Sequence, residues 1–182
     1  MSVENIRNKV LEEISVSFMG IEQKEIDELV KRVLEAKRIF LYGERREDIP
    51  IKGFCMRLSH LGLTAFHLGD VCTPNMNAGD LLIVSCASGS SGVGAVYMKT
   101  ARQTGVGVVL LTDTIGNVEY EMADDVIMIP VPDVGGEAPS IQPRGALYEQ
   151  VLWLTLDYAE LLLQSFVGGD EQQRVGRHAN IL

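Results

Sequence analysis

The sequence predicts an α/β fold: a three-layer αβα sandwich with a five-stranded parallel sheet. Short apolar runs recur along the chain, and they are too short and too rich in β-branched residues to be helices. Segments with helical spacing separate these runs, which indicates right-handed crossovers between parallel strands and a sheet covered on both faces. The predicted strands are residues 38–42, 80–85, 106–112 and 125–129, with a weaker one at 64–68.

Helical segments have apolar residues three and four positions apart, and they fill the intervals between the strands. Two further amphipathic helices precede the first strand and are separated at Gly20. The predicted helices between strands are residues 51–61, 92–103 and 117–123, and the two at the front are residues 3–18 and 22–36.

The last predicted helix, residues 145–166, is apolar around most of its circumference. This is more apolar surface than one face of a sheet needs. The helix is therefore expected either to lie between the subunits of a homo-oligomer, a dimer or tetramer, or to be the central helix of the monomer.

The chain is long enough to bury one sizeable core, so one domain over residues 1–182 is expected. Its parts are the N-terminal helices at 3–36, the α/β core at 37–130, and the C-terminal helix and tail at 145–182.

Charge and cysteine content limit the partners and the compartment. The formal net charge is −9, so neither a nucleic acid nor an anionic membrane surface is an expected partner. The first residues mix charged and apolar side chains and resemble neither a signal peptide nor a membrane span. Cys55, Cys72 and Cys86 lack CxxC or Cys/His spacing, so we interpret them as buried thiols without a disulfide or metal site. We expect a cytoplasmic protein.

Candidate chemistry lies in the loops after the strands, because ligands of an open parallel sheet bind at the carboxyl ends of the strands. Residues 43–48 (GERRED) and 86–92 (CASGSSG) form two such loops. The second is the better anion site, because small residues allow close approach, serine hydroxyls donate and a helix begins there. The same pattern also fits a serine N-cap with flexible glycines. The Gly- and Pro-rich segment 130–144 is expected to be functional or disordered.

Several segments together resemble the 6-phospho-3-hexuloisomerases, which are enzymes with a sugar-isomerase (SIS) domain. The resemblance covers nearly the whole chain in order and spacing. It is carried by LYG (41–43) with the arginine loop that follows, MRLSHLG (56–62), SGSS (88–91), QPRGALYEQ (142–150) and RHAN (177–180).

The resemblance implies interconversion of a 3-ketohexose 6-phosphate and fructose 6-phosphate through an enediol, without a metal or organic cofactor. It also implies that Glu149 is the base and that His178 assists proton transfer or binds the sugar. Considered by themselves, Glu149 could be an acidic helix-start residue and His178 an exposed tail residue. His60 is expected to be a packed structural histidine, and His67 has no assigned role.

The expected partner is a small phosphorylated sugar. By resemblance, its phosphate and hydroxyls would be held by Arg46, Ser88, Gly89, Ser90, Ser91, Arg144 and Gly145.

The first loop departs from the family pattern. Glu47 and Asp48 stand where the family has serine and glycine, and Glu44 and Arg45 replace two small residues. A carboxylate about 4 Å from a phosphate costs on the order of 4 kcal/mol at an effective dielectric near 20. Glu47 is therefore not expected to face a phosphate unless Arg45 or Arg46 neutralises it.

The second loop is also altered, because Cys86 and Ala87 replace a serine and a glycine of the pattern, while Arg144 adds a cation near the last helix. Three functions remain open. The chain could be an isomerase with a phosphate contact relocated to Arg144, or an SIS enzyme for a different sugar or acid. It could also be a non-catalytic phosphosugar-binding SIS domain with a sensing or assembly role.

Overall fold

The computed structural model describes residues 3–87, 92–116, 118–132, 139–168, 171–178 and 180. It confirms the predicted α/β fold. All strand pairs are parallel, and the sheet order is β2-β1-β3-β4-β5. The strands are β1 (Ile39–Gly43), β2 (Ala65–His67), β3 (Leu81–Ser85), β4 (Gly107–Thr112) and β5 (Asp125–Met128).

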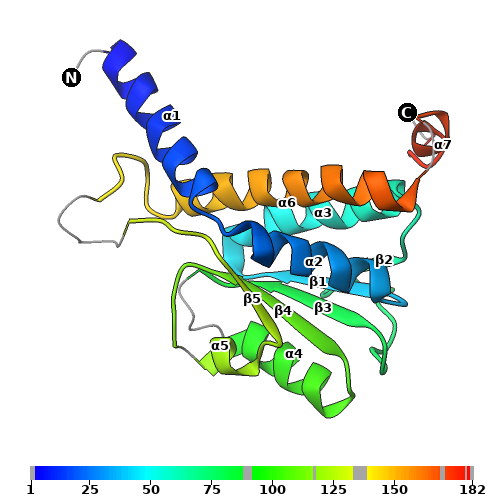
Figure 1. Ribbon diagram of the computed structural model, residues 1–182. Coiled ribbons are helices and arrows are strands. Elements are labelled where there is room, and N and C mark those ends of the chain that lie inside the picture. The colour runs from blue at the N-terminus through cyan, green and yellow to red at the C-terminus, as the bar shows by residue number, and fades with distance from the viewer. Residues whose placement is uncertain are drawn as a thin grey trace.

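Helices cover both faces of the sheet (Figure 1). On one face lie α2 (Gln23–Glu35), α3 (Asp48–His60) and α6 (Ala146–Val167), and on the other lie α4 (Gly92–Gln103) and α5 (Val118–Met122). The helix α1 (Val3–Met19) projects beyond the start of α6. Two short helices were not predicted: the 3₁₀ turn η1 (Arg45–Glu47) and α7 (Glu171–Val175).

The third helix begins earlier than predicted, at Asp48 rather than at residue 51. Proline is tolerated in the first turn of a helix, where its missing N–H has no intrahelical partner, so Pro50 does not delay the start. The Asp48 carboxylate also accepts a hydrogen bond from the Gly43 N–H at 3.2 Å, which joins the helix start to the end of β1.

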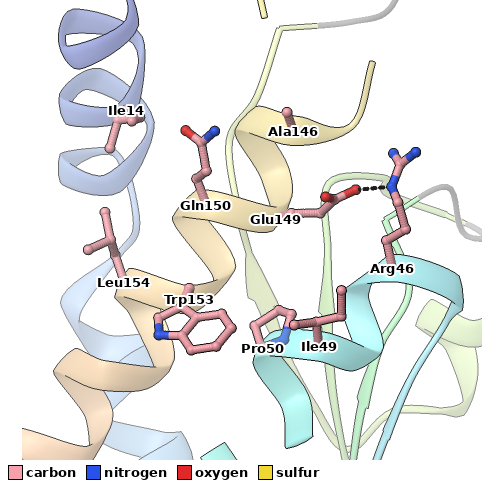
Figure 2. Close-up of a pocket in the computed structure, with 9 residues that line it drawn as sticks. All are labelled: Ile14, Arg46, Ile49, Pro50, Ala146, Glu149, Gln150, Trp153 and Leu154. Carbon is pink, nitrogen blue, oxygen red and sulfur yellow. Dashed lines mark hydrogen bonds and ion pairs between the residues drawn. The ribbon is translucent and has the colours of Figure 1, made fainter. Parts of the chain in front are cut away.

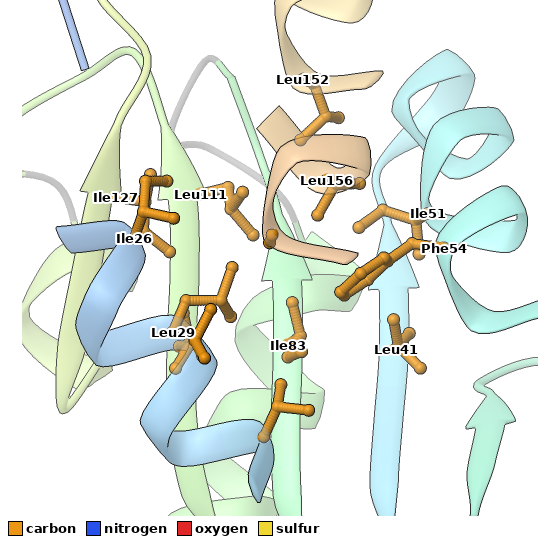
Figure 3. Packing of buried hydrophobic residues seen from close by; sticks show 14 of the residues in the cluster. Ile26, Leu29, Leu41, Ile51, Phe54, Ile83, Leu111, Ile127, Leu152 and Leu156 are labelled. Carbon is orange, nitrogen blue, oxygen red and sulfur yellow. The ribbon is translucent and has the colours of Figure 1, made fainter. Parts of the chain in front are cut away.

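The core consists of two apolar layers, because successive strand residues point to opposite faces of the sheet. Leu41, Ile83 and Leu111 pack under α2, α3 and α6, as Figure 3 shows, whereas their neighbours Leu82 and Leu110 pack toward α4. The sheet places the loops after β1, β3 and β4 side by side at the carboxyl ends of its strands.

The last long helix, α6, has apolar side chains both in the core and on the surface. Leu152, Leu156 and Leu163 are buried against the other helices and are almost inaccessible to solvent. Other apolar side chains on the same helix are exposed: Trp153, Leu154, Leu161 and Phe166. A homo-oligomer that covers them stays a prediction.

The interpretation of all three cysteines as buried thiols is wrong for Cys72, which is exposed. It lies in the loop after β2, and such connections run over the protein surface. Cys86 is buried, and Cys55 is half-buried, where burial raises the pKa of its thiol to about 11. Among the helices of the described residues, none combines the length and apolarity needed to cross a bilayer.

Candidate active site

Arg46 connects the loop after β1 with the start of α6. Its Nε donates a hydrogen bond to Glu149 Oε1 at 2.7 Å, and its Nη2 donates to the backbone oxygen of Arg144 at 2.8 Å. Figure 2 shows the arginine side chain reaching across to the carboxylate. The structure thus brings together four of the predicted site residues: Arg46, Arg144, Gly145 and Glu149.

Gly145 makes this contact possible. It is the N-cap residue of α6 and has a φ of 84°, which L-residues rarely adopt. A Cβ atom at this position would lie 2.6 Å from Arg46 Nη2 and 3.2 Å from Glu149 Oε1. The glycine therefore leaves room for the ion pair.

Two cavities flank this segment. The first, of about 500 Å³, lies between α1, α3 and α6 and is largely apolar, with the Arg46–Glu149 pair in its wall. It is lined by Ile14, Arg46, Ile49, Pro50, Ala146, Glu149, Gln150, Trp153 and Leu154 (Figure 2).

The second cavity, of about 450 Å³, lies at the carboxyl ends of the strands, where the fold predicts ligand binding. Ala87, Asp113 and Thr114 follow β3 and β4, while Arg144 and Tyr148 come from the start of α6. Residues of the proline-rich segment form the remaining wall. Arg144, which the sequence suggested as a relocated phosphate contact, lines this cavity.

Glu47 points toward the second loop. Its Oε2 accepts a hydrogen bond from Ser85 Oγ at 2.8 Å, and both carboxylate oxygens lie 3.1 Å from the Ala87 N–H. Burial raises the pKa of Glu47 to about 7, and the carboxylates of Asp113 and Glu44 contribute in the same direction, against the lowering effect of the two donors. The Glu47 carboxylate thus accepts hydrogen bonds from Ser85 and Ala87 at the base of the candidate anion loop, residues 86–92.

A buried hydroxyl chain continues from this carboxyl group. Ser85 Oγ lies 3.1 Å from the Tyr148 hydroxyl. Because the serine gives its single proton to Glu47, the tyrosine hydroxyl must donate to the serine. Burial, followed by the charge of Glu47, raises the pKa of Tyr148 well above its ordinary value, so its hydroxyl stays protonated.

Asp48 turns away from Glu47, toward β2. Its Oδ1 lies 2.6 Å from His67 Nε2, and its Oδ2 lies 2.8 Å from Lys52 Nζ. Although burial alone would raise the pKa of Asp48, the hydrogen bonds from Lys52 and His67 lower it. His67, which had no assigned role, therefore contacts the start of α3 and does not line the cavity at the strand ends.

His178 lies at the other end of α6 from Glu149. Its ring stacks on His60 at a centroid distance of 3.8 Å, beside the Arg57–Asp157 ion pair. Figure 1 shows α7, which precedes His178, beyond the far end of α6. One chain therefore does not bring the two predicted catalytic residues together. His60 is half-buried, and this burial, followed by the charge of His178, lowers its pKa.

The four loop residues Ser88, Gly89, Ser90 and Ser91 lie outside the described residues. Within the ranges that the structure describes, no group of three His, Cys, Asp or Glu side chains could hold a metal ion.

Sequence reasoning missed Glu13, which holds the proline-rich segment in place. Its buried carboxylate accepts hydrogen bonds from Ser140 Oγ at 2.6 Å, from Ile141 N at 3.0 Å and from Gln142 Nε2 at 3.2 Å. Nothing local marks an acidic residue of α1 for this task. Asp113 and Thr114 were also missed, although their place directly after a predicted strand was a usable signal.

The five-stranded parallel sheet with helices on both faces is the fold of SIS domains, the class to which solved phosphosugar isomerases belong. A phosphoheptose isomerase from Francisella tularensis shares the fold, with a TM-score of 0.72 at 15% identity over 91% of this chain and 100% of that chain. No protein-family model matches the sequence.

Closer relatives narrow the class. The 3-hexulose-6-phosphate isomerase of Bacillus subtilis is 31% identical over 177 residues, which cover 95% of each chain. A Methanococcus jannaschii protein, for which this function was inferred from its crystal structure, has a TM-score of 0.82 at 27% identity and covers 97% of both chains. The chain belongs to the 3-hexulose-6-phosphate isomerase family.

Proposed function

We propose that the protein interconverts a 3-ketohexose 6-phosphate and fructose 6-phosphate in the cytoplasm. The observation that carries the proposal is the Arg46–Glu149 contact at 2.7 Å: it holds the residue predicted as the base at the start of α6, next to Arg144 and Gly145 of the cavity at the strand ends. The names of the full-length relatives support the same reaction.

The reaction needs one group to move a proton between neighbouring carbons. In the forward direction a base removes the proton from C2 of the 3-ketose and forms the 2,3-enediolate, with the negative charge on O3. Return of a proton to C3, with transfer of the O2 hydroxyl proton to O3, gives the 2-ketose. We assign the carbon-to-carbon transfer to Glu149 Oε2, because Arg46 holds Oε1.

The phosphate is assigned to the cavity at the strand ends, where Arg144 supplies charge. The serines at 88, 90 and 91 are assigned to the phosphate from the sequence alone. His178 is assigned to proton transfer or sugar binding from another copy of the chain, since its own α6 separates it from Glu149. The exposed apolar side chains of α6 support a homo-oligomer in which such a contribution is possible.

A second candidate function is a non-catalytic phosphosugar-binding domain. One observation favours it: Glu47 carries negative charge at the base of the anion loop. Under this alternative, fructose 6-phosphate raises the melting temperature of the protein, but no turnover occurs.

The test is a coupled assay that detects fructose 6-phosphate formed from 3-hexulose 6-phosphate. We expect turnover by the wild type and a loss of kcat of at least about 100-fold in Glu149→Gln, the usual scale of a lost acid–base group. Glu35→Gln, at the exposed end of α2, removes the same charge away from the cavities and is the matched control. Unchanged kcat in Glu149→Gln contradicts the assignment of the base.

A further inference from the structure

Glu47 already occupies two hydrogen-bond donors at the base of the second cavity, the Ser85 hydroxyl and the Ala87 N–H. The Ser85 hydroxyl has one proton, which it donates to Glu47 Oε2, and the single Ala87 N–H is shared between the two carboxylate oxygens. Ala87 lines the cavity directly, and Ser85 reaches it through Tyr148. A ligand anion beside Ala87 would therefore meet a negative charge instead of a donor.

The groups around Glu47 make this conflict stronger. Asp113, from the loop after β4, and Glu44, from the loop after β1, contribute negative charge. Tyr148 of α6 and Ser85 of β3 contribute hydroxyls. Arg46, the next residue along the chain, directs its guanidinium to Glu149 and Arg144 instead.

Protonation reverses the role of Glu47 at this position. A carboxylate only accepts hydrogen bonds, whereas a carboxylic acid also donates one. A protonated Glu47 leaves the site without a competing charge and adds an O–H donor. Its pKa of about 7 lets this exchange occur near neutral pH.

We propose that Glu47 determines which charge the cavity accepts: as a carboxylate it is itself the anion held by Ser85 and Ala87, and a ligand phosphate binds beside Ala87 only when Glu47 takes up a proton. The proposal rests on the proposed function for the nature of the ligand, a phosphorylated sugar. It assigns Glu47 as a specificity-determining residue. While Glu47 is ionised, the cavity favours an uncharged hydroxyl at this position.

The test uses sulfate, whose charge does not change between pH 6 and pH 8, and measures its dissociation constant by calorimetry. For a group of pKa about 7 that must be protonated, the wild type binds sulfate roughly tenfold more weakly at pH 8 than at pH 6. Binding at pH 8 takes up close to one proton, which is measured in two buffers of different ionisation enthalpy.

Two variants test whether Glu47 causes this pH dependence. Glu47→Gln is expected to bind sulfate with little pH dependence and about tenfold more tightly than the wild type at pH 8. Glu44→Gln removes a neighbouring carboxylate that accepts a hydrogen bond from Tyr42 rather than from the loop, so its sulfate affinity should still fall as pH rises, with a midpoint slightly lower than in the wild type because Glu44 contributes to the raised pKa of Glu47. Wild-type measurements alone test the proposal should Glu47→Gln fail to fold.

Three results overturn the proposal: a wild-type affinity that is constant with pH, a Glu47→Gln variant that follows the wild type, or a lack of sulfate binding by both proteins at both pH values. None of these results depends on turnover. Loss of the proposed isomerase function would appear separately, as absence of fructose 6-phosphate formation together with the expected sulfate behaviour.

Discussion

Replacement of Glu47 by glutamine should change how stability depends on pH. The glutamine oxygen can still accept hydrogen bonds from Ser85 and Ala87, but the side chain no longer titrates. In the wild type, the folded-state pKa is raised above the unfolded value, so the folded protein keeps a proton that the unfolded chain has lost. Wild-type stability therefore falls as pH rises between the two pKa values and levels off above the folded one.

The magnitude follows from the size of the shift. A pKa raised from 4.5 to about 7 corresponds to about 3 kcal/mol, at 1.36 kcal/mol per unit. Relative to Glu47→Gln, the wild type should lose about 3 kcal/mol of unfolding free energy between pH 4.5 and pH 8.

Urea denaturation of both proteins at half-unit pH intervals measures this difference, and all other titrating groups cancel in the comparison. Glu44→Gln, which removes the adjacent carboxylate, is the control and should run nearly parallel to the wild type. If the wild-type and Glu47→Gln curves are also parallel, the buried contact of Glu47 with Ser85 and Ala87 does not exist in solution.

Two further substitutions test the surroundings of the site. Gly145→Ala forces a left-handed conformation on an L-residue and directs its Cβ at Arg46, so a loss of at least about 1 to 2 kcal/mol in urea denaturation is expected. Gly92→Ala, where an added Cβ meets no atom within 4 Å, should cost less, and equal effects would contradict the argument. Glu13→Gln leaves one oxygen for three donors and turns an amide N–H₂ toward at least one of them, so it should destabilise the protein by about 1 to 3 kcal/mol. Hydrogen exchange at Ile141 should accelerate in this variant, and unchanged exchange would show that Glu13 does not anchor the segment.

The sheet could be predicted from the sequence because its signals are local. Runs such as residues 81–85 are too short and too β-branched for a helix, and parallel strands that alternate with helices allow few topologies. The site was harder to predict, because the direction of a side chain in a loop depends on the backbone conformation of that loop. Glu47 and Arg46 are adjacent, yet one points inward to β3 and the other outward to α6.

Whether Glu149 and His178 can lie in the same site depends on the length of α6 and on how copies of the chain assemble. The sequence places both in the C-terminal part of the chain, but a helix of this length separates the two ends by tens of ångströms. Family resemblance identifies both residues without telling which chain supplies each.

The backbone at Arg45 has a consequence for engineering the first loop. Arg45 has a φ of 53°, a left-handed conformation that is strained for arginine and relaxed for glycine. A glycine at position 45 would therefore relieve the strain that arginine carries in this turn. Arg45→Gly would restore a small residue on the backbone that is already present, whereas Asp48→Gly would remove the carboxylate that joins the start of α3 to β1 and to His67.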